Sequence, residues 1–171
     1  MTLRLAGAST ALLAGVLTLG VVLSLPVLGE GSPSSPAPSS NAAGAAPAGA
    51  SDADILLAGK RVWSDAACYN CHGNNGQGGH SADFPAGPSL RKSVLDPESM
   101  LMITECGIPD TRMPAWLKGA YTELECYGNP IGPAPSGILV SGAYSEDQLK
   151  DLVAYVQVAF MKQPMPTWSD R

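Results

Sequence analysis

The sequence predicts an all-α domain of three or more helices, because three helix-start signals are spread along it. Ser51 precedes an apolar pattern and has Asp54 three residues later, which is the pattern of a capping box. Asp96 is followed by Pro97, a pair typical of the N-cap and first position of a helix. A second capping box begins at Ser145. We expect irregular loops between the three helices.

Apolar spacing supports each of these helices. The first should cover residues 52–67, the second should run from Asp96 to near Gly107, and the third should end before Pro164. Residues 108–144 are expected to be irregular. The apolar stripe of the third helix consists of Leu149, Leu152, Val153, Val156 and Phe160.

Residues 1–29 are predicted to be a signal peptide or a membrane anchor. Arg4 is followed by an uncharged apolar run over residues 5–28. A signal-peptide core has about 7–15 residues and a spanning helix needs about 20, so the length suits an anchor. Small residues at 27–29 and at 48–50 also resemble cleavage sites. Both interpretations stay open, and both place the rest of the chain across the membrane.

Composition divides the remainder of the chain. Residues 30–51 are rich in Ala, Pro, Ser and Gly and lack large apolar side chains, so we interpret them as a flexible linker. Residues 52–165 should form the folded domain, and residues 166–171 a tail. The chain has 10 basic and 15 acidic residues and no basic cluster, which gives no indication of nucleic-acid binding.

The segment Cys68-Tyr69-Asn70-Cys71-His72 is a CxxCH motif directly after the first helix. Two cysteines at this spacing can bond both vinyl groups of a haem, and the adjacent histidine then becomes the proximal iron ligand. The motif therefore predicts one covalent haem c, held by Cys68, Cys71 and His72.

Two other interpretations of the cysteines are weaker. A zinc site usually needs a second closely spaced ligand pair, whereas Cys106 and Cys126 are far apart. A thioredoxin-type CxxC requires a strand before it and a long helix after it, and here a helix precedes and a glycine-rich loop follows. The compartment outside the cytoplasm is oxidising, so we expect Cys106 and Cys126 to form a disulfide.

Met113 is the expected second axial ligand of the iron. It lies in a non-helical segment, and Pro114 stiffens the backbone that presents the sulfur. His80 is the alternative, but it follows His72 closely on the same glycine-rich loop and would have to cross the porphyrin edge. Thioether ligation raises the haem potential relative to a second imidazole.

These residues together resemble the class I monohaem cytochromes c over about residues 55–160. Gly59 and Trp63 are similar to that family's first helix, and Gly87-Pro88-Ser89-Leu90 is similar to its Gly-Pro-x-Leu segment. The resemblance implies that the Pro88 carbonyl accepts a hydrogen bond from the proximal histidine and that Leu90 packs on the haem.

Two further segments match the family in order. Met113-Pro114-Ala115-Trp116 resembles the segment that supplies the axial sulfur, and Leu152-Val153-Ala154-Tyr155 resembles the last helix. The resemblance implies that Tyr155 packs near Gly59. Three other assignments stay open: Arg91 and Arg112 could each meet a haem propionate or be solvated, and Trp116 could line the haem or pack in the core.

One departure from the family concerns the long segment between the methionine and the last helix. A Cys-Gly before Met113 and Cys126-Tyr127-Gly128 after it resemble a proteobacterial subgroup, some of whose members work with periplasmic alcohol dehydrogenases. Redox proteins are therefore the expected partners: a periplasmic dehydrogenase, possibly an alcohol-oxidising one, a terminal oxidase or another cytochrome.

The function predicted from these residues is electron transfer, with the haem iron cycling between Fe(II) and Fe(III). We expect a carrier rather than an enzyme, although it could be the cytochrome subunit of a dehydrogenase. It should be periplasmic, either soluble or anchored to the outer face of the cytoplasmic membrane. A peroxidase or a gas sensor would need an open or displaceable sixth position on the iron, and Met113 argues against one.

Overall fold

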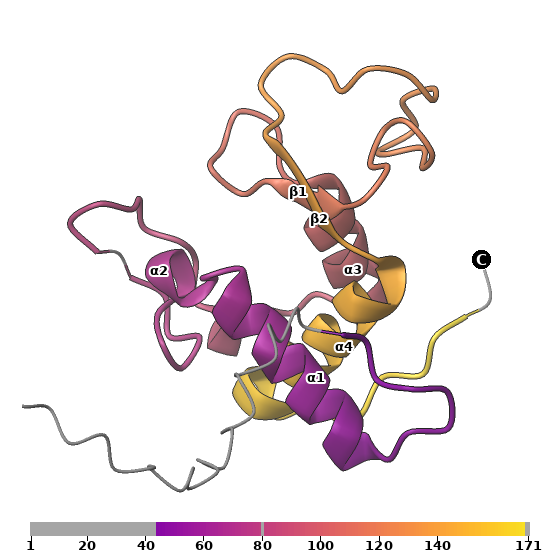
Figure 1. Ribbon diagram of the computed structural model, residues 1–171. Helices are drawn as coiled ribbons and strands as arrows, with labels where there is room; N and C mark the ends of the chain where they lie inside the picture. Colours follow the sequence, from indigo (N-terminus) through magenta and orange to yellow (C-terminus); the bar gives the residue numbers. More distant parts are fainter. Residues whose placement is uncertain (1–43, 80, 170–171) are drawn as a thin grey trace, which may run out of the picture. The chain divides into compact units, whose positions relative to one another are not determined.

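The computed structural model describes residues 44–79 and 81–169, all within one unit of the chain, residues 38–171 (Figure 1). The predicted export segment 1–29 lies outside the described residues, as do most of the linker 30–51 and His80. In the described part of the chain, no helix is both long enough and apolar enough to cross a membrane.

The described residues form four α-helices, three of which begin where the sequence predicts. A full capping box between Ser51 and Asp54 starts α1 (Asp52–Asp65). The Asp96 carboxylate accepts a hydrogen bond from the Ser99 amide at 2.8 Å and starts α3 (Pro97–Cys106). Ser145 and Gln148 form the box that starts α4 (Glu146–Val156). The remaining helix, α2 (Tyr69–His72), is a single turn. A 3₁₀ turn, η1 (Leu90–Lys92), and a π-helical turn, η2 (Gln157–Met161), complete the helical elements.

Helices α1 and α4 cross and pack against each other (Figure 1), and Gly59 lies at their contact. A Cβ atom on this glycine would lie 2.0 Å from the Asp151 carbonyl oxygen and 2.8 Å from the Tyr155 Cβ. Tyr155 therefore packs at Gly59, as the resemblance implies. One turn further along α1, the Trp63 ring lies 4.9 Å from the ring of Phe160. The crossing thus joins both ends of the domain sequence in one core.

We predict that Gly59→Ala destabilises the protein by about 3 kcal/mol, since overpacking a tight contact with backbone atoms costs roughly 1–3 kcal/mol and here both helices must move apart. Chemical denaturation followed by circular dichroism measures the change. Gly132→Ala is the matched control, because its added Cβ would have only the Pro130 oxygen nearby, at 3.9 Å. Equal stability of the two variants would contradict the prediction.

The domain is not all-α, and the prediction of an all-α fold is wrong. Residues 108–144, expected to be irregular, contain β1 (Ala115–Leu117) and β2 (Val140–Tyr144), which pair in parallel. The Ala115 amide donates to the Leu139 carbonyl at 2.7 Å, and the Lys118 amide donates to the Tyr144 carbonyl at 2.8 Å. The pair forms because Ala115 and Leu117 are buried against α3, and their backbone groups then need partners away from water.

Candidate haem-binding site

The CxxCH motif occupies one helical turn. The amides of Cys71 and His72 donate to the Cys68 carbonyl at 3.3 and 3.0 Å, so the three side chains share one face. Ala67, with φ 52°, separates α1 from this turn and redirects the chain. Burial raises the pKa of the Cys68 thiol to about 12, so in this fold the thiol is protonated at neutral pH.

His72 is held in one orientation by the loop that follows it. Its Nδ1 atom lies 3.0 Å from the Pro88 carbonyl oxygen, and a carbonyl can only accept, so Nδ1 carries the hydrogen. The Nε2 lone pair then remains for a metal ion. This is the hydrogen bond that the resemblance implies. Gly87 permits it, because a Cβ there would lie 2.7 Å from the Cys71 carbonyl oxygen and 3.0 Å from Nδ1.

The rest of the loop folds back onto the same turn. The Gly78 amide donates to the His72 carbonyl at 2.7 Å, and the Arg91 amide donates to the Gly76 carbonyl at 3.2 Å. Leu90 is half-buried and packs against the core, whereas the Arg91 side chain is exposed. The loop therefore places the Gly-Pro-Ser-Leu segment beside the motif.

Met113 lies in a second segment, residues 107–114, which we call the methionine loop. Gly107 ends α3 with φ 69°, and a Cβ on it would lie 2.6 Å from the Ala115 amide nitrogen. The Ile108 amide donates to the Met113 carbonyl, and the Met113 amide donates to the Thr111 hydroxyl, each at 3.1 Å. The backbone on both sides of the half-buried Met113 is thus fixed.

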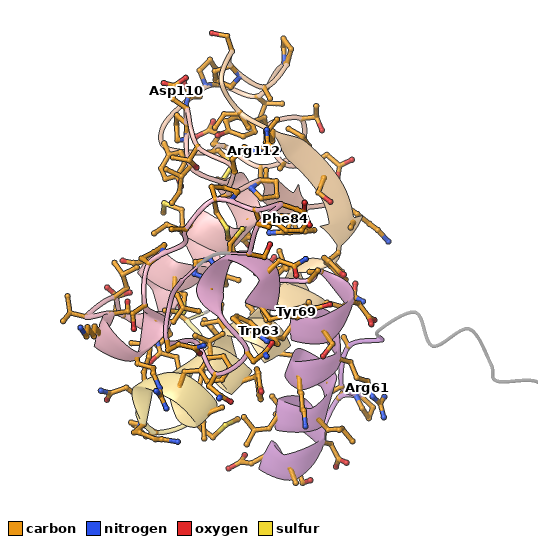
Figure 2. All side chains as sticks on the ribbon, turned by 90° about the vertical axis from the view of Figure 1, so that its left-hand side faces the viewer. Arg61, Trp63, Tyr69, Phe84, Asp110 and Arg112 are labelled. Atoms are coloured by element: carbon orange, nitrogen blue, oxygen red, sulfur yellow. A yellow bond between two sulfur atoms is a disulfide. The ribbon has the colours of Figure 1, made fainter. Side chains whose placement is uncertain are left out.

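The remaining candidate residues flank the methionine loop. The half-buried Trp116 ring lies 5.8 Å from the Tyr144 ring, which is an aromatic contact within the domain. Arg112 is exposed. Figure 2 shows Asp110 and Arg112 at one end of the domain and Arg61, on α1, near the other. The structure thus brings Cys68, Cys71, His72 and the Gly-Pro-Ser-Leu segment together, while Met113 and Trp116 belong to a separate segment after α3.

The predicted disulfide is confirmed. Cys106 and Cys126 are bonded, and both are fully buried. This bond removes the two thiols that a zinc site at the motif would need. Across residues 44–79 and 81–169, no three His, Cys, Asp or Glu side chains gather to hold a metal ion.

The donor set fits a covalent haem. Cys68 and Cys71 keep free thiols on one face of a helical turn, and the imidazole beside them presents Nε2. The second axial donor would be the Met113 thioether. The sequence did not reveal two tyrosines, Tyr121 and Tyr127, whose hydroxyl groups bond to the end of α3. No local signal in the sequence around them indicates this role, because each hydroxyl bonds to a carbonyl that is distant along the chain.

Comparison with known protein families supports a covalently attached haem c. The family model of cytochrome c matches residues 56–159, a range that includes the motif, the Gly-Pro-Ser-Leu segment and the methionine loop. No curated protein and no solved structure matched the chain.

Proposed function

The chain belongs to the cytochrome c family, and on this premise we propose that it is a periplasmic electron carrier with His72 and Met113 as axial ligands. Membership implies a covalently attached haem c and makes the chain a haem-binding electron-transfer protein. The ligand pair, the compartment and the partners are our proposal. When bound, the haem supplies the one-electron Fe(II)/Fe(III) couple.

The observation that carries the proposal is the hydrogen bond from His72 Nδ1 to the Pro88 carbonyl. It fixes the tautomer and the ring orientation and makes Nε2 a better donor. Cys68 and Cys71 anchor the group from the same helical turn. A donor held this firmly keeps its position in both oxidation states, so little reorganisation accompanies electron transfer.

Met113 would close the other side of the iron. A neutral thioether favours Fe(II) and so raises the potential. The hydrogen bonds of the methionine loop support this role, because they restrict the backbone that presents the sulfur. A closed sixth position keeps small molecules from the iron, as a carrier requires and as a peroxidase or gas sensor does not.

The disulfide supports a location outside the cytoplasm, because cytoplasmic thiols are kept reduced. We further propose that the chain is a class I cytochrome of the proteobacterial type, on the Cys-Gly before Met113 and the Cys-Tyr-Gly after it. A periplasmic dehydrogenase, possibly an alcohol-oxidising one, would donate the electron, and a terminal oxidase or another cytochrome would accept it.

The test is spectroscopic and uses the full-length holoprotein. We predict that the oxidised protein shows the near-infrared absorption band of a methionine–Fe(III) bond and that the reduced protein leaves added carbon monoxide unbound. Immediate carbon monoxide binding by the reduced wild-type protein would contradict the proposal and favour an enzyme or a sensor.

A further inference from the structure

The segment between β1 and β2, residues 118–139, reaches back to the end of α3; we call it the insert (Figure 1, upper loops). The Tyr121 hydroxyl donates to the Cys106 carbonyl at 3.0 Å, and the Tyr127 hydroxyl donates to the Gly107 carbonyl at 2.5 Å. Carbonyls at a helix C-terminus lack partners within the helix. The insert supplies hydrogen-bond donors to two such carbonyls, those of the consecutive residues Cys106 and Gly107.

The Tyr127 contact acts on a peptide unit that also bonds to Met113. The carbonyl of Gly107 and the amide of Ile108 belong to one planar peptide group. The carbonyl accepts from Tyr127, and the amide donates to the Met113 carbonyl at 3.1 Å. Fixing one end of a rigid plane fixes the other, and hydrogen bonds in such a chain polarise each other. The hydroxyl therefore orients the group that holds Met113.

The insert also bonds to the chain on both sides of Met113, to Asp110 in the methionine loop and to Ala115 at the start of β1. The Asp110 amide donates to the Gly137 carbonyl at 3.0 Å, and the Ala115 amide donates to the Leu139 carbonyl at 2.7 Å. Figure 2 shows Asp110 at the end of the domain where these loops lie. With the Cys106–Cys126 disulfide, these contacts enclose the loop.

Residues with a left-handed backbone conformation are frequent where the insert bonds to the end of α3 and to the methionine loop. Five non-glycine residues in the described part of the chain have a positive φ, and three of them are Asp110, Tyr121 and Tyr127. Such residues persist in left-handed conformations only where surrounding contacts impose them. Each of the three residues makes one of the hydrogen bonds described above, through the hydroxyls of Tyr121 and Tyr127 and the amide of Asp110.

We propose that the insert is a clamp for the methionine loop and that Tyr127 is a positioning residue for the Met113 sulfur. This inference rests on the proposed role of Met113 as axial ligand. Thioether binds Fe(III) more weakly than Fe(II), so the clamp matters most in the oxidised state. Without it, an added nitrogen ligand displaces the sulfur more easily.

The test is a titration of the oxidised holoprotein with imidazole, followed by loss of the methionine–Fe(III) band. Tyr127→Phe removes only the hydroxyl of a residue that is 43% exposed, so the fold should be retained. Losing one hydrogen bond should lower the imidazole concentration at the midpoint about tenfold. The unfolding midpoint, followed by helix circular dichroism, should change little.

Tyr155→Phe is the matched control. Tyr155 is a half-buried tyrosine of α4 that packs against Gly59 and Trp63 of α1, and its variant should keep the wild-type imidazole midpoint. The double variant Cys106→Ala/Cys126→Ala is a second test of the clamp. It should lower the imidazole midpoint, as Tyr127→Phe does. A wild-type midpoint in both insert variants would overturn the clamp, as would equal lowering in Tyr155→Phe. If the wild-type protein lacks the band altogether, Met113 is not the ligand, and the inference falls with the proposed function.

Discussion

Met113→Ala is expected to open the iron to added ligands: the methionine–Fe(III) band disappears, and carbon monoxide binds the reduced protein at once. If the sulfur occupies the sixth position about 99% of the time, its removal increases apparent ligand affinity roughly a hundredfold. The reduction potential should fall, because the donor that favours Fe(II) is gone. Carbon monoxide titration and spectroelectrochemistry measure both effects.

Met102→Ala provides the comparison for this experiment. Met102 lies on α3 and is 45% exposed, so losing its side chain should leave the band and the ligand affinity unchanged. The assignment of Met113 is wrong if Met113→Ala keeps the wild-type spectrum while His80→Ala alters it.

The second large effect concerns attachment of the haem. Wild-type protein should keep its haem through denaturing electrophoresis and should weigh one haem more than the apo chain. Cys68→Ala should sharply lower the yield of holoprotein, because a single thioether remains and the motif turn loses one of its two anchors. Mass spectrometry and a haem stain of the gel give the result.

Tyr69→Phe serves as the control for attachment. Tyr69 lies between the two cysteines and is 39% exposed, and its hydroxyl has no part in thioether formation, so its haem content should equal that of the wild type. Haem that leaves the wild-type protein in acid–acetone would show that no covalent bond exists.

The helix starts could be predicted because their signals are local. Ser51, Asp96 and Ser145 each cap a helix with their own side chain, and the apolar spacing that follows fixes which face is buried. The crossing at Gly59 is less local and came from the family resemblance. The structure supplies its physical reason, which is that the Asp151 carbonyl leaves no room for a Cβ.

The strands could not be predicted in the same way. A three-residue strand such as Ala115–Leu117 is too short to show alternation, and its partner lies beyond the whole insert. Parallel pairing between such distant segments depends on the packing of α3 against β1. Neither the spacing of apolar residues nor the helix-capping signals predict the pairing of β1 with β2.

In the candidate site, too, residues marked by local patterns could be predicted and residues joined by long-range contacts could not. The motif and the methionine are read from short patterns, and the resemblance adds Pro88 as the partner of His72. The hydroxyl bonds of Tyr121 and Tyr127 join residues that are far apart along the sequence, so no local pattern predicts them. Their left-handed backbones appear only when the insert is folded.

The Cys106–Cys126 bond also constrains the unfolded chain. It closes a ring across a sequence separation of 20 residues. In the chain-entropy account, the entropy lost by the unfolded chain raises its free energy by about 3 kcal/mol for a ring of this size. The unfolded ensemble therefore stays compact around the methionine loop and exposes less new surface to denaturant. Because the slope of unfolding free energy against denaturant concentration follows that surface, it is smaller than for an unbridged chain of the same length.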